Sequence, residues 1–151
     1  MIVRRLHGIG GQSGGSGGSL TKIGSGRLQH TRTNTYTGNI IISAGVLKVD
    51  GSITSNMFVN RHSMLASTGN VYGAVTGHGA VCPGDPLGTL TVDSETQPIG
   101  SGRLPIDIAG TSAGQLSVLN VLGNVNVNGF LDSVLLDGFS PSIGDQFIFL
   151  K

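Results

Sequence analysis

The sequence is poor in the residues that commonly build active sites and nucleic-acid surfaces. It has a single cysteine, no tryptophan, 5% aromatic residues and 11% charged residues in 151 positions. One cysteine excludes an intramolecular disulfide and a zinc site made of several cysteines. We therefore expect Cys82 to act as a small buried or half-buried packing residue and not as a reactive thiol.

Charge is scarce and almost evenly divided between the two signs. The formal net charge is +1 and the sequence pI is about 8.0, so the chain has no long-range field that would attract nucleic acid or anionic lipid. The basic residues are scattered and form no stripe with interleaved aromatics. We expect no nucleic-acid partner.

Long apolar runs are missing as well. No segment approaches the length of a membrane-spanning helix, and the first residues contain two arginines without the apolar stretch of a signal peptide. Residues 10–19 are almost wholly Gly and Ser, a composition typical of flexible coil. We predict a flexible Gly/Ser-rich segment over residues 1–19, an ordered region over residues 20–151 and no membrane span.

Glycine is abundant, with 26 residues, and much of it belongs to a repeated three-residue phrase. The phrase is a glycine, any residue, and an aliphatic residue that opens an alternating apolar run. Regular recurrence predicts a stacked architecture, because each unit has an apolar face that only a neighbouring unit can cover. The copies are Gly26-Arg27-Leu28, Gly45-Val46-Leu47, Gly79-Ala80-Val81, Gly88-Thr89-Leu90, Gly102-Arg103-Leu104, Gly114-Gln115-Leu116, Gly129-Phe130-Leu131 and the serine variant Ser63-Met64-Leu65.

Alternation of apolar and polar residues places the strands. A residue and its second neighbour share one face of a strand, and turn residues such as Asp50-Gly51 and Asn128-Gly129 separate the apolar runs. No window shows a capped helical period. The sets expected to point inward are Ile40 and Ile42; Leu47 and Val49; Leu90 and Val92; Leu104, Ile106 and Ile108; and Val125 and Val127.

Hairpins and a coil of parallel strands both fit short strands at this spacing. The roughly 18-residue interval between Gly26, Gly45 and Ser63 is near the length of one three-stranded turn of a parallel β-helix. The predicted fold class is therefore all-β, a right-handed parallel β-helix or solenoid, with inward aliphatic ladders.

Four motifs carry a resemblance to a known family. They are Leu20-Thr21-Lys22, Gly24-Ser25-Gly26, Asn34-Thr35-Tyr36-Thr37-Gly38 and Ala44-Gly45-Val46-Leu47. Residues 20–53 thereby resemble the autotransporter-associated β-strand repeat of bacterial autotransporter passenger regions, and later segments resemble the turns and rungs that follow it. The resemblance implies a β-helical stalk outside the outer membrane. The chain stops within the last resembling phrase, so we expect it to be a piece of a longer passenger.

Some positions depart from the family pattern. Arg32, Arg61-His62 and His78 stand where members usually have glycine, serine or threonine, and Cys82 stands where alanine is usual. Pro105 falls inside a predicted strand, where it cannot donate to the ladder.

Candidate catalytic and metal-binding residues are few. The acids are mostly single and lie in turn contexts, which favours turn capping over a paired catalytic site. The histidines are too far apart in sequence for a local metal motif, and we expect them at the surface or in turns. We predict no catalytic, cofactor or metal residues and no cofactor. The acids are Asp50, Asp85, Asp93, Glu95, Asp107, Asp132, Asp137 and Asp145, and the histidines are His7, His30, His62 and His78.

These observations predict a non-enzymatic structural stalk segment of an autotransporter-like protein, at the bacterial surface or secreted, that supports adhesion to an unknown ligand or host surface. One alternative is a carbohydrate-binding or carbohydrate-active module on the same scaffold. The other is a truncated gene product with no role of its own. The expected partners are neighbouring rungs of a longer chain, and we expect self-association through open β-helix ends, with residues 147–150 as the stickiest edge.

Overall fold

The computed structural model describes residues 2–3, 18–94, 96–99 and 102–151, and none of them lies in a helix. Short strands follow one another through most of the described residues up to Leu135. Their bounds are β1 Ile2–Val3, β2 Leu20–Lys22, β3 Arg27–His30, β4 Thr33–Asn34, β5 Ile40–Ile42, β6 Gly45–Val49, β7 Ser52–Ile53, β8 Met57–Val59, β9 Ser63–Ser67, β10 Asn70–Val71, β11 Val75–Gly77, β12 Ala80–Pro83, β13 Thr89–Val92, β14 Thr96–Ile99, β15 Arg103–Ile108, β16 Val118–Val121, β17 Asn124–Val127 and β18 Phe130–Leu135.

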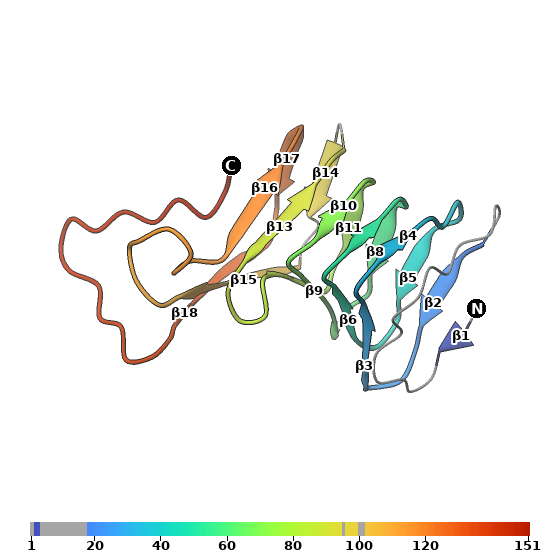
Figure 1. Ribbon diagram of the computed structural model, residues 1–151, viewed down its shortest axis with the longest axis horizontal. Helices are drawn as coiled ribbons and strands as arrows, with labels where there is room; N and C mark the ends of the chain where they lie inside the picture. The colour runs from blue at the N-terminus through green and yellow to red at the C-terminus, as the bar shows by residue number, and fades with distance from the viewer. Residues whose placement is uncertain (1, 4–17, 95, 100–101) are drawn as a thin grey trace.

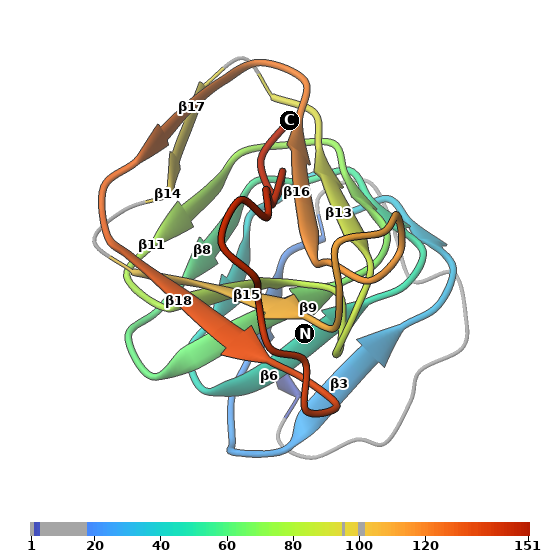
Figure 2. The ribbon, with the colours of Figure 1, turned by 90° about the vertical axis from the view of Figure 1, so that its left-hand side faces the viewer.

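The strands form three parallel sheets around a common axis (Figure 1). We name the three sheets A, B and C. Sheet A has the strand order β1-β2-β5-β8-β11, sheet B the order β18-β15-β12-β9-β6-β3, and sheet C the order β16-β13-β10-β7-β4. A separate pair, β14-β17, continues the side of sheet A (Figure 2). Each turn of the chain adds one strand to each side, so the predicted all-β parallel solenoid is confirmed.

The longest inward ladder lies in sheet B. Leu28, Leu47 and Leu65 are in register in β3, β6 and β9, and all three are fully buried. Val81 and Leu104 continue the ladder in β12 and β15. Burying such a side chain contributes about 1.5 to 3 kcal/mol, so this column is a major source of the stability of the stack.

The other two sheets supply the remaining walls of the interior. The inward side chains of sheet A are Leu20, Ile40, Met57 and Val75 in one row, and those of sheet C are Ile53, Val71, Val92 and Val121. The inward sets expected from alternation are buried, including Ile40 with Ile42 and Leu104 with Ile106 and Ile108. Val125 packs against this core, while the side chain of Val127 lies outside the described part.

The repeated phrase has one structural meaning at six of its copies. Its glycine or serine is the first residue of β6 and β9 and directly precedes β3, β12, β15 and β18. Its middle residue lies on the outer face, and its aliphatic residue takes the register position of the ladder, which is buried in all of these strands except β18. A Cβ at Gly45 would lie 2.4 Å from Gly26 O, and one at Gly102 would lie 2.2 Å from Gly79 O. Glycine therefore permits the close stacking of corners. The copies at Gly88 and Gly114 lie elsewhere, before β13 and in the loop between β15 and β16.

Two basic side chains, those of Lys22 and His30, lie in the interior. Lys22 is 1% exposed, and its Nζ donates hydrogen bonds to the carbonyl oxygens of Ile23, Gly24 and Ala44 at 3.1, 2.7 and 3.0 Å. His30 is fully buried, so the expectation of a surface or turn position was wrong for it. The reason is alternation: His30 is two residues after inward Leu28 and takes the same face.

The C-terminal segment returns to the stack. Leu119 N donates to Phe149 O at 2.8 Å, and Lys151 N donates to Leu119 O at 3.0 Å, so residues 149–151 extend sheet C beyond β16. Phe147 packs against the core, whereas Ile148 is 62% exposed. At the other end, Ile2–Val3 pairs with β2, and residues 4–17 of the expected flexible segment lie outside the described residues. The boundary at residue 20 stays a prediction.

Candidate functional site

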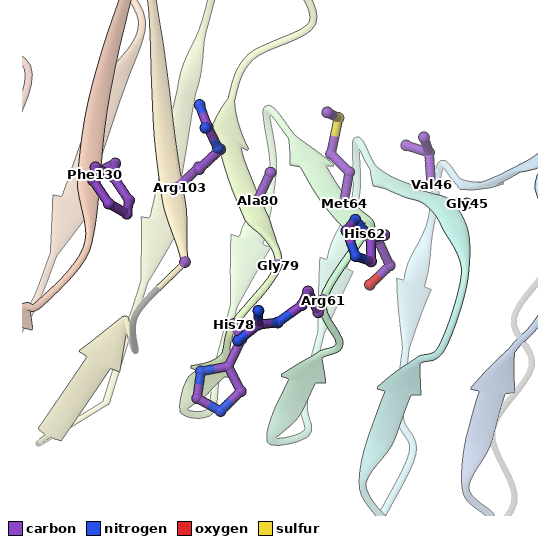
Figure 3. Close-up of a pocket in the computed structure, with 12 residues that line it drawn as sticks. Gly45, Val46, Arg61, His62, Met64, His78, Gly79, Ala80, Arg103 and Phe130 are labelled. Carbon is purple, nitrogen blue, oxygen red and sulfur yellow. The ribbon is translucent and has the colours of Figure 1, made fainter.

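A groove of about 670 Å³ runs along the corner where sheet A passes into sheet B (Figure 3). Its lining comes from successive turns of the solenoid: the starts of β6, β9, β12, β15 and β18, and the turns that precede β9 and β12. The groove therefore extends parallel to the solenoid axis and crosses one turn after another.

The floor of the groove consists of the middle residues of the repeated phrase. Val46, Met64, Ala80 and Arg103 occupy consecutive register positions on the outer face of sheet B, and Phe130 follows Arg103 in β18. The same glycine corners that bring the turns together add no side chains of their own to this face. The resulting floor is largely apolar and open.

The rim of the groove is basic. Arg61 and His62 form the turn between β8 and β9, and His78 lies between β11 and β12; all three are exposed. Arg61 extends along the axis toward His78 (Figure 3). His62 has φ 66°, a left-handed conformation uncommon for a residue with a Cβ. Among the described residues that line the groove, none is acidic.

Arg103 is held in place by two neighbours on β18. Its Nη1 donates to Asp132 Oδ2 at 2.6 Å, and its guanidinium carbon lies 5.8 Å from the centre of the Phe130 ring. Both contacts are exposed, so each contributes modestly to stability. Their effect is to keep the guanidinium beside the aromatic ring at the C-terminal end of the groove.

Ser63 is the only phrase copy that starts with serine in place of glycine, and its hydroxyl is used structurally. Its Oγ lies 2.7 Å from both Ile42 O and Asn60 O, between which its single proton is shared. The residue is 3% exposed. Ser63 therefore ties the basic turn at Arg61 and His62 to the strand of the preceding rung and presents no free nucleophile to the groove.

The acidic residues of the central turns lie on another part of sheet B. Lys48 Nζ is 3.6 Å from Asp50 Oδ1 and 3.4 Å from Asp85 Oδ2. Burial raises the pKa of Asp85, but the hydrogen bond and charge of Arg27, with Lys48, outweigh it and lower the pKa below 3.8. Burial, together with the charge of Asp85, raises the pKa of Asp107.

Cys82 lies beside these carboxylates and is half-buried, as expected. Burial, followed by the negative charges of Asp107 and Asp85, raises the pKa of its thiol to about 12. The thiolate is the nucleophilic form of cysteine. At neutral pH this site therefore presents a protonated, unreactive sulfur.

Two histidines that are distant in the sequence lie in the same groove. His62 and His78 are far apart in the chain, yet each lies in a corner turn of the groove because one solenoid turn separates them. A spacing close to one repeat was the signal that could have grouped them with Arg61. His30 lies in the core, and His7 falls outside the described residues. In the part of the chain that the structure covers, no three His, Cys, Asp or Glu residues are clustered for a metal ion.

Comparison with known proteins gives partial matches. No family model matches the chain. The chain is similar to two proteins of Serratia marcescens, each named extracellular serine protease, with 42% identity over 77 residues and 38% identity over 79 residues. Each match covers 50% of this chain and 7% of the relative, so half of the chain corresponds to a small part of much longer proteins.

These relatives correct one expectation. The sequence predicted a protein that is not an enzyme, and that prediction is contradicted because both relatives are named as proteases. The matched part is 7% of each relative and assigns no catalytic residue to this chain. The word extracellular in both names agrees with a secreted or surface location. Over the described residues, the structure has no helix with the length and hydropathy needed to cross a bilayer.

Proposed function

We propose that this chain is a structural segment of the passenger region of an autotransporter-type extracellular protein, in which it forms a rigid stalk. The observation that carries the proposal is the continuous inward ladder through β3, β6, β9, β12 and β15, which joins successive turns into one rod. The similarity of half the chain to extracellular proteins of Serratia marcescens supports the location. The motifs of residues 20–53 support the passenger assignment and its place outside the outer membrane.

The physics of a solenoid suits this task. Each turn hydrogen-bonds to the turns before and after it, and its apolar residues are covered only by those neighbours. The stack therefore resists bending through backbone hydrogen bonds and apolar packing between turns, and it presents its outer faces to solvent. Such a segment holds other parts of a protein at a fixed distance from a surface.

An exchange experiment tests the stalk. The matched segment of one Serratia protease is replaced by this 151-residue chain, and protease-resistant passenger outside the cell is measured. We expect the native chain to support export and resistance. Two controls, the same chain with Ile40→Asp and a Gly/Ser linker of equal length, should fail. Equal export and resistance with the flexible linker would show that no folded stalk is required.

A second candidate function follows from the names of the relatives. The segment can serve as the scaffold of an extracellular serine protease whose catalytic residues lie outside the matched part. Extending the reading frame in the flanking DNA tests this directly. A protease domain in frame supports the scaffold role, whereas a complete passenger without such a domain contradicts it.

A further inference from the structure

We propose that the corner groove binds a linear anionic polysaccharide, one whose successive sugars carry carboxylate or sulfate groups. The proposal goes beyond a stalk function, since it assigns a ligand class to one outer edge of the solenoid. It rests on the charge, the spacing and the floor of the groove.

The charge of the groove favours an anion. Arg61 and Arg103 are permanently charged, and His62 and His78 add two further cationic or hydrogen-bonding groups to the lining. Among the described residues, Arg61 has no carboxylate partner, whereas Arg103 is paired with Asp132. No acid lines the described groove. Arg61 is thus a permanent cation in a groove whose described lining holds no acid to balance it.

The spacing of these groups favours a linear polymer that runs along the axis. Arg61, His78 and Arg103 belong to the turns that end in β9, β12 and β15, which are consecutive in sheet B. Neighbouring strands are about 4.7 to 4.9 Å apart. That interval is close to the length of one sugar residue in an extended polysaccharide, so one anionic group per sugar meets one basic group per turn.

The floor favours a sugar over a peptide or a nucleic acid. β6, β9 and β12 are paired on both sides, so a peptide cannot add to the groove as a strand. Single-stranded nucleic acid needs several aromatic rings for its bases, and Phe130 is the one aromatic side chain among the described lining residues besides the two imidazoles. Phe130 is 67% exposed and, with Met64 and Val46, offers an apolar surface for the faces of pyranose rings.

Binding to the full 151-residue chain tests the proposal. The probes are fluorescein-labelled heparin fragments as the sulfated source, oligogalacturonate as the carboxylated source, dextran as a neutral sugar and single-stranded DNA as a competing polyanion. Fluorescence anisotropy is measured at low and physiological salt, because electrostatic binding weakens with ionic strength. We expect binding to at least one of the two anionic sugars, with the preferred source identified by their ratio, and none to dextran.

Matched variants separate the groove from general charge attraction. Arg61→Gln combined with His78→Gln should weaken binding about tenfold or more, since charge-assisted hydrogen bonds are lost. Arg32→Gln removes an exposed arginine from another corner and should leave the affinity unchanged. Phe130→Ala should weaken binding to sugars while the circular dichroism spectrum is retained, which checks that the fold persists.

Several results would overturn the proposal. They are no binding to either anionic sugar at low salt, equal loss of affinity with Arg32→Gln and the double variant, or equal binding to dextran. Tighter binding to single-stranded DNA than to both anionic sugars would show that the groove prefers nucleic acid to an anionic polysaccharide. None of these results depends on export. The ligand proposal can therefore fail while the stalk function, which the exchange experiment tests, still holds.

Discussion

Asp85, in the loop after β12, accepts a hydrogen bond from Arg27 at the start of β3, although 58 positions separate them in the sequence. The same carboxylate lies 3.4 Å from Lys48 Nζ in β6. The loop around Asp85 therefore reaches back over the outer face of sheet B and contacts two earlier turns.

A double-mutant cycle measures the strength of this tie. Arg27→Gln and Asp85→Asn each remove one partner, and the coupling energy from urea denaturation should be about 1 kcal/mol or less, because the pair is partly exposed to solvent. The pKa of Asp85 is below 3.8 in the fold, so its contribution should be present above pH 4 and lost as the pH falls through that lowered pKa. A coupling that persists unchanged at pH 2 would contradict this origin.

Neighbouring isoleucines in β5 test the inward ladder of sheet A. Ile40 is fully buried and Ile41 is 38% exposed. Ile40→Asp should cost several kcal/mol, since it buries an unpaired carboxylate, whereas Ile41→Asp should cost about 1 kcal/mol or less. Urea midpoints measure the difference. Similar midpoints for the two variants would refute the assigned faces.

His30 should make the fold sensitive to mild acid. Its ring packs edge-on against Tyr36, with centroids 6.1 Å apart. Burial lowers the pKa of His30 below 6.5, and a weaker hydrogen-bonding interaction with the Asn34 side chain opposes this shift without cancelling it. The unfolded chain then binds more protons between the lowered pKa and 6.5, so stability falls as pH drops through this window.

The variant His30→Leu isolates that effect. It keeps an apolar side chain in the ladder and removes the titrating ring, so its unfolding free energy should decline less between pH 7 and 5 than that of the native chain. The comparison uses urea denaturation at each pH, and other titrating groups cancel between the two proteins. Parallel pH profiles would contradict this, because they would show that the pKa of His30 is the same in the folded and the unfolded chain.

Alanine variants of two glycines with similar backbone angles distinguish the cost of backbone strain from the cost of a steric clash. Gly45 has φ 69° and Gly138 has φ 71°, but a Cβ at Gly45 meets Gly26 O at 2.4 Å while one at Gly138 meets nothing within 4 Å. Gly45→Ala should therefore lose about 1 to 3 kcal/mol more than Gly138→Ala. Thermal unfolding of both variants checks it. Equal losses would mean that the corners can move apart at no cost.

Self-association through the C-terminal end stays a prediction: besides residues 147–150, the structure offers the end of sheet B as a second surface. Within the described residues β18 pairs with β15 alone, and Leu135 at its end is 48% exposed. Leu135→Lys should reduce self-association at micromolar concentration, and Ile148→Lys should do so as well. Tyr72→Lys, on a residue equally exposed at 48%, is the control. Light scattering that shows a monomer for the native chain would contradict the expectation.

Much of the interior followed from local pattern. Alternation fixed the inward faces of β5, β6, β13 and β15, because a strand has a strict period of two. The phrase of glycine, any residue and aliphatic residue predicted the corners. Alternation from inward Leu20 places Lys22 on the same face. The sequence does not show what stabilises its buried ammonium, because the carbonyl oxygens around it, among them Ala44 O, are brought together only by the fold.

The groove was harder to predict for the same reason. Arg61, His62 and His78 appeared in the sequence as separate departures from a family pattern. Their proximity depends on which residues of successive turns lie in register. The separation of two residues in the sequence predicts this only when the number of residues in each solenoid turn is known. Loops of unequal length between β12 and β16 hide that period in the second half of the chain.

The outward middle position of each repeated phrase has a consequence for how this protein can evolve. Backbone register and inward packing constrain the residues on either side of it, but Arg27, Val46, Met64, Ala80, Arg103 and Phe130 show that the position itself accepts cationic, aliphatic and aromatic side chains. Mutations there rewrite the outer surface one turn at a time while the scaffold persists. Selection can therefore change the chemistry of this outer face, and with it any ligand that the face binds, while the residues that determine the fold stay the same.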